Sequence, residues 1–311
     1  MRPPENDNQL KIWEKRFPQY TTNLCHIERQ FYRSFDPSWY LRALQQMEAP
    51  SDGDWLDRYS DTSEEHERYE LVSDETEFDT FRATFSRMLR YMSSESLLVL
   101  LASGYPFGPT PAVAVRLRNR ALTELVEKIA QREVPNTRDY SPFSVSGSFD
   151  EWFGYMLFRE SNPPDELKSY VDFAVGEANF IKDRSAINAY KHSRMLRPVE
   201  GQPARIRTED GVDLLPEISS ALHWTELAIK LVPGQRQEQS TISFEELNFE
   251  NDCKAILSAA ALMTLLQQVR LGWHEDTKEL SVTLPLINMA KSHPFRIRLT
   301  ETANYREGER N

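Results

Sequence analysis

Four polar side chains that could act together in acid–base or anion-binding chemistry lie between residues 184 and 192. Successive residues of a helix are turned by roughly 100°, so a helix here would place all four within about a third of its circumference: Arg184, Asn188, Lys191 and His192. A histidine can take or give a proton near neutral pH, and a nearby guanidinium or ammonium can hold a phosphate or a developing oxyanion. These groups suffice for metal-free RNA cleavage, in which the 2′-hydroxyl attacks the adjacent phosphate.

Further basic residues follow this cluster, and Arg194 and Arg197 extend its charge toward the next element. A local basic excess suits a phosphate-bearing partner, so we predict that these two arginines bind substrate. Ile187 would lie on the other side of the helix and anchor it to a bundle. The alternative is a solvated helix face, with His192 hydrogen-bonded locally and the arginines serving solubility.

The segment NAYKH (188–192), near the start of a late helix of a helical chain, resembles the HEPN superfamily. The resemblance covers about residues 75–275 and implies a compact helical domain of the kind found in prokaryotic toxins, antiviral defence proteins and RNases. Active members carry an arginine, a polar residue next to it, and a histidine that four to six intervening residues separate from the arginine. By dimerising, they bring two such motifs together to cut RNA.

This chain differs from the family pattern at the arginine, because Ser185, Ala186 and Ile187 fill the positions that should hold it. The resemblance therefore assigns only His192 as the general acid or base and Asn188 as its polar partner. Arg184 or Lys191 would supply the cation on their own chemistry.

Two functions stay open at this point. One is a HEPN-like metal-independent ribonuclease of the toxin or phage-defence type, which acts on RNA as a homodimer. The other is a catalytically inactive helical module for protein–protein interaction.

The composition is that of a globular protein, with 311 residues, 40% of them hydrophobic and 27% charged. The net charge of −11 argues against a surface that grips nucleic acid all over, but it leaves room for a local basic site. Much of the acidic excess lies in segment 51–79, where Arg58 and Arg68 are the only basic residues. We expect this segment to be the surface for any protein partner.

Other chemistry finds no support in the sequence, so no cofactor or metal is predicted. The pair His66-Glu67 would need a second histidine at position 70 for a zinc site, and Glu70 stands there. The glycine-containing loop 102–111 lacks the GK[ST] of a phosphate loop. The longest apolar run, near Ala255–Leu266, is shorter than the ~20 residues that span a bilayer, and no secretory signal is visible. We expect a cytoplasmic protein without a membrane segment.

Apolar residues recur at helical spacing through most of the chain, and this periodicity predicts a helical bundle. Residues 1–50 are expected to form short helices or an extended arm. The expected long or well-defined helices cover about 75–103, 111–132, 149–159 and 250–273. Residues 163–197 are expected to form a long amphipathic helix followed by a second helical segment.

After Pro198 the apolar pattern changes to a period of two, which predicts strands. Hairpin turns are expected at Asp210-Gly211 and Pro233-Gly234, and a C-terminal antiparallel pair at 279–287 and 293–301. The fold is therefore predicted to be mainly α, a helical bundle with a small antiparallel β insertion before the last long helix and a C-terminal β pair. The predicted divisions are an N-terminal extension 1–74, a bundle 75–275 with the insertion at about 203–247, and a C-terminal part 276–311. Whether the β segments share one sheet stays open.

Overall fold

Helices make up most of the described chain, as the periodicity predicted. A computed structural model describes residues 18–48, 75–103, 119–135, 147–158, 167–183, 187, 197–200, 220–232, 235–274 and 296–306. The chain divides into two compact units. We call them the helical unit (Met1–Leu41, Met88–Arg184 and Glu250–His293) and the sheet unit (Arg42–Arg87, Ser185–Phe249 and Pro294–Asn311).

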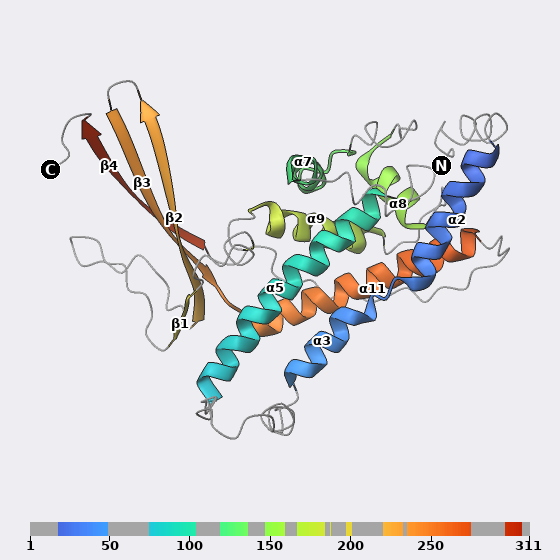
Figure 1. The fold of residues 1–311 in the computed structure, drawn as a ribbon. Coiled ribbons are helices and arrows are strands. Elements are labelled where there is room, and N and C mark those ends of the chain that lie inside the picture. Colours follow the sequence, from blue (N-terminus) through green and yellow to red (C-terminus); the bar gives the residue numbers. More distant parts are fainter. Residues whose placement is uncertain are drawn as a thin grey trace, which may run out of the picture. The chain divides into compact units, whose positions relative to one another are not determined.

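The helical unit draws on helices from all parts of the chain (Figure 1). They are α2 (Pro18–Ser34), the start of α3 (Ser38–Glu48), the second half of α5 (Glu75–Ala102), α7 (Asn119–Ala130), α8 (Phe149–Phe158), α9 (Leu167–Lys182) and nearly all of α11 (Phe249–His274). On α9, the residues Tyr170, Ala174, Ala178 and Ile181 are all buried and form the inner stripe of an amphipathic helix. Helix α11 is buried on most of its sides, as its apolar composition predicted.

Two helix ends in this unit are closed by local hydrogen bonds. At the start of α8, Ser148 and Glu151 form a capping box, in which the Glu151 carboxylate accepts from the Ser148 N–H at 2.9 Å and the Ser148 hydroxyl accepts from the Glu151 N–H at 3.3 Å. At the end of α7, the N–H of Glu133 donates to the carbonyl of Lys128, and the N–H of Arg132 to that of Ile129. This Schellman motif requires the left-handed backbone of Arg132, whose φ is 56°.

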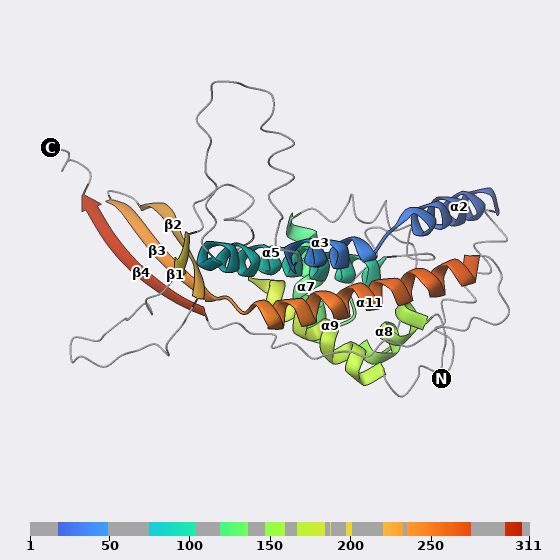
Figure 2. The same cartoon turned by 90° about the horizontal axis from the view of Figure 1, so that it is seen from below.

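The sheet unit contains one four-stranded antiparallel sheet in the order β1-β2-β3-β4 (Figures 1 and 2). Its strands are β1 (Arg197–Glu200), β2 (Ser220–Val232), β3 (Gln235–Glu246) and β4 (Arg296–Arg306). Strands β2 and β3 pair directly, with Val232 opposite Gln235. The hairpin predicted around Pro233-Gly234 is thereby confirmed.

The C-terminal strand β4 pairs with β3 along its whole length, so it joins the inserted strands in a single sheet (Figure 2). Segment 279–287, the partner predicted for this strand, and the hairpin predicted around Asp210-Gly211 lie outside the described residues. The domain boundaries at 74 and 275 stay predictions.

Candidate functional site

Most of the predicted site lies outside the described residues, so its geometry stays a prediction: Arg184, Asn188, Lys191, His192 and Arg194. Ile187 is described, and it is helical and only 3% exposed. This burial agrees with the anchoring role expected for that side of the helix. Arg197 is the first residue of β1 and stands directly opposite His223 of β2 in the strand register.

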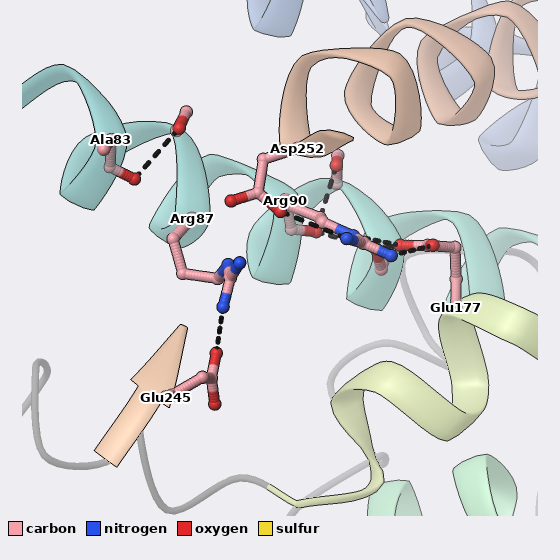
Figure 3. Close-up of polar contacts among 9 residues, drawn as sticks. Ala83, Arg87, Arg90, Glu177, Glu245 and Asp252 are labelled. Atoms are coloured by element: carbon pink, nitrogen blue, oxygen red, sulfur yellow. Dashed lines mark hydrogen bonds and ion pairs between the residues drawn. The ribbon is translucent and has the colours of Figure 1, made fainter. Parts of the chain in front are cut away.

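The polar centre of the helical unit is the guanidinium of Arg90, on α5 (Figure 3). Its Nε and Nη2 atoms donate to the two carboxylate oxygens of Glu177 on α9, at 3.0 and 2.7 Å. Its Nη1 donates to Oδ1 of Asp252 on α11 at 3.1 Å. The same guanidinium lies 3.9 Å from the ring centroid of Phe180. One side chain therefore ties three helices together through charge-assisted hydrogen bonds, one pair of which has the bidentate geometry that arginine favours.

The negative charge of the two carboxylates is stabilised by groups other than the Arg90 guanidinium as well. Glu177 also accepts a hydrogen bond from the hydroxyl of Ser94, at 2.6 Å. Asp252 lies in the first turn of α11, where the helix dipole and the backbone N–H groups favour a negative charge. Two carboxylates can thus share one arginine, although all three side chains are at most 2% exposed.

The sheet unit holds a second buried ion pair, between Arg87 of α5 and Glu245 of β3 (Figure 3). Arg87 is 1% exposed and Glu245 is fully buried. Ser243, two residues earlier on the same strand, is also buried, and its hydroxyl has no hydrogen-bond partner among the described residues. The pair therefore fixes the end of β3 against the first half of α5, within this unit.

A third buried arginine, Arg270, joins α11 to α2 and α8 in the helical unit. It hydrogen-bonds the Tyr32 hydroxyl, and its Nη2 donates to the carbonyl of Met156 at 3.3 Å. The side-chain amide of Gln267, one turn earlier, donates to the carbonyls of Tyr32 and Phe35, both at 2.6 Å. These carbonyls end helix α2, so Gln267 satisfies acceptors that the helix itself leaves without a partner.

These buried arginines hold the fold together, because side chains that are 0–1% exposed cannot reach a polymeric substrate. Helical periodicity and motif spacing alone did not point to them. A signal was nevertheless available, since Arg87 and Arg90 interrupt the apolar stripe of α5, and Glu177 falls on the inner stripe of α9. Charged residues are almost never fully buried unless they are paired, so such positions predict partners across the core.

Tyr40 on α3 has the one clearly raised pKa among the described residues. Burial raises the pKa of its hydroxyl above the ordinary value of 10.0, and the charge of Glu95 raises it further. A 2.8 Å hydrogen bond with the Ser96 hydroxyl acts in the opposite direction. The phenol therefore stays neutral at physiological pH, which fits a role in packing α3 against α5 within the helical unit.

The described residues contain no group of three or more histidine, cysteine, aspartate or glutamate side chains that could hold a metal ion. One segment among them, Phe249–Gly272, is long and apolar enough to cross a membrane, and 67% of its apolar window is buried in the protein. Such burial is compatible with the core helix of a soluble protein.

Comparison of the chain with protein-family models, with curated proteins and with solved structures finds no match. The resemblance of the NAYKH segment to the HEPN superfamily stays a prediction.

Proposed function

We propose that this protein is a cytoplasmic, metal-independent ribonuclease of the HEPN type, with a role as a toxin or in phage defence. His192 acts as the general acid or base, Asn188 is its polar partner, and Arg184 or Lys191 stabilises the charge on the phosphate. Arg194 and Arg197 bind phosphates of the RNA backbone next to the cleaved bond. Two protomers bring two such clusters together.

The observation that carries this proposal is the burial of Ile187 within a helical turn. If that helix continues, the four polar side chains lie between about 40° and 140° around the axis from Ile187, at roughly 100° per residue. They would then occupy the flank beside the buried stripe, where a side chain can be positioned by the core and still reach solvent.

Chain connectivity limits how far the cluster can lie from the sheet. His192 precedes Arg197, the first residue of β1, by five residues. A fully extended chain of that length spans at most about 18 Å. The histidine therefore belongs near the β1 end of the sheet, within the same compact unit.

The proposed reaction needs no external reagent. A base removes the proton of the 2′-hydroxyl, whose oxygen attacks the adjacent phosphorus while the bond to the 5′-oxygen breaks. An acid protonates the leaving oxygen, so the products are a 2′,3′-cyclic phosphate and a free 5′-hydroxyl. The imidazole of His192 can fill one of these roles, and that of the second protomer the other.

The test is cleavage of total RNA in EDTA by the wild type, by His192→Ala and by the control His66→Ala. General acid–base catalysis contributes roughly 10²- to 10⁴-fold, so His192→Ala should lower the rate by about 100-fold or more. The control histidine should leave it unchanged. Equal rates in the two variants would end the proposal. Dilution should lower the rate per protomer if two clusters must meet.

One observation favours a second candidate function, a non-catalytic module that binds a protein partner. The acidic segment 51–79 runs into the start of α5, and its residues 51–74 lie outside the described ones. Directly after this segment, α5 presents Phe81 with 56% of its surface exposed. Its ring stacks on Phe85 at a centroid distance of 5.7 Å, and the exposed Asp79 lies near it in the sequence. A surface that combines acidic and aromatic side chains is suited to bind a partner protein with a basic surface. The test uses a protein partner isolated with the wild-type chain and a variant that lacks residues 51–74 and carries Phe81→Ser. A partner that binds this variant as well as the wild type would exclude this surface as the binding site.

A further inference from the structure

We draw no further inference here: the strongest candidate, the exposed apolar side chains of Trp39 on α3 and Met92 on α5 in the helical unit, carries nothing, because nothing in the described part of the chain shows what covers them.

Discussion

The guanidinium of Arg90 is fully buried between two carboxylates, whereas that of Arg120 is 92% exposed beside Glu124. Both make short contacts with carboxylates, but their energetics differ. Water screens the exposed pair, and ordering the two long side chains costs entropy that offsets most of its gain. Water does not screen the buried charges. Removing the Arg90 cation would therefore leave two carboxylates in the core without a positive partner. At the residue scale, burial decides which charges hold the fold.

We expect Arg90→Met to lower the free energy of unfolding by about 3–5 kcal/mol, measured by urea denaturation at neutral pH. Glu177→Gln should cost less, about 1–2 kcal/mol, because Arg90 keeps its ion pair with Asp252 and the new glutamine amide can still accept a hydrogen bond from Arg90. Arg120→Ala serves as the control and should change stability by less than about 0.5 kcal/mol. A cost for Arg90→Met as small as that of the control would refute the structural role of the network.

Tyr40 provides a test of pH dependence. Its pKa is raised in the folded state, chiefly by burial, so the folded protein binds more protons than the unfolded chain above pH 10. Its contribution is fully present below that pH and is lost as the pH rises toward the folded pKa. The stability of the wild type should therefore fall more steeply between pH 9 and pH 11 than that of Tyr40→Phe, in urea titrations at each pH. Parallel pH profiles would contradict the burial of this hydroxyl.

At the scale of elements, helix ends show how local geometry and tertiary contacts combine. Arg132 ends α7 in the left-handed region, and it also pairs with Asp172 of α9. Glycine is the usual residue at such a position, because a side chain there costs conformational energy. The arginine keeps its place through the ion pair to the neighbouring helix.

The two contributions at position 132 can be separated by substitution. Arg132→Gly and Arg132→Ala both remove the ion pair, but only the glycine removes the backbone strain. We expect the glycine variant to be the more stable of the two by about 1 kcal/mol in urea denaturation. A more stable alanine variant would mean that this residue does not hold a positive φ in solution.

Periodicity in the sequence was enough to predict α5, α8, α9, α11 and the β2–β3 hairpin, because each pattern reflects one buried face. The partner of β4 could not be predicted in this way. Pairing between distant strands depends on which edge is available in the folded chain, and no local pattern encodes it. The partners of Arg87 and Arg90 were missed for a related reason, since spacing identifies a buried charge but not the residue across the core.

At the scale of the whole molecule, a chain with a net charge of −11 concentrates basic residues between 184 and 197. Such a contrast suits a local site for a polyanion on a surface that otherwise repels it. The sequence could indicate the residue types and their angles around one helix. It could not indicate which other segment faces them, because that depends on tertiary packing and on a second protomer.

Attack by the 2′-hydroxyl can be tested with one RNA oligonucleotide and its 2′-deoxy counterpart, each incubated with the protein in EDTA and analysed by mass spectrometry. The wild type should cut the RNA into fragments ending in a 2′,3′-cyclic phosphate and leave the deoxy strand intact. His192→Ala should cut neither. Cleavage of the deoxy strand, fragments with 5′-phosphates, or full activity in His192→Ala would contradict an attack by the 2′-hydroxyl under the control of His192.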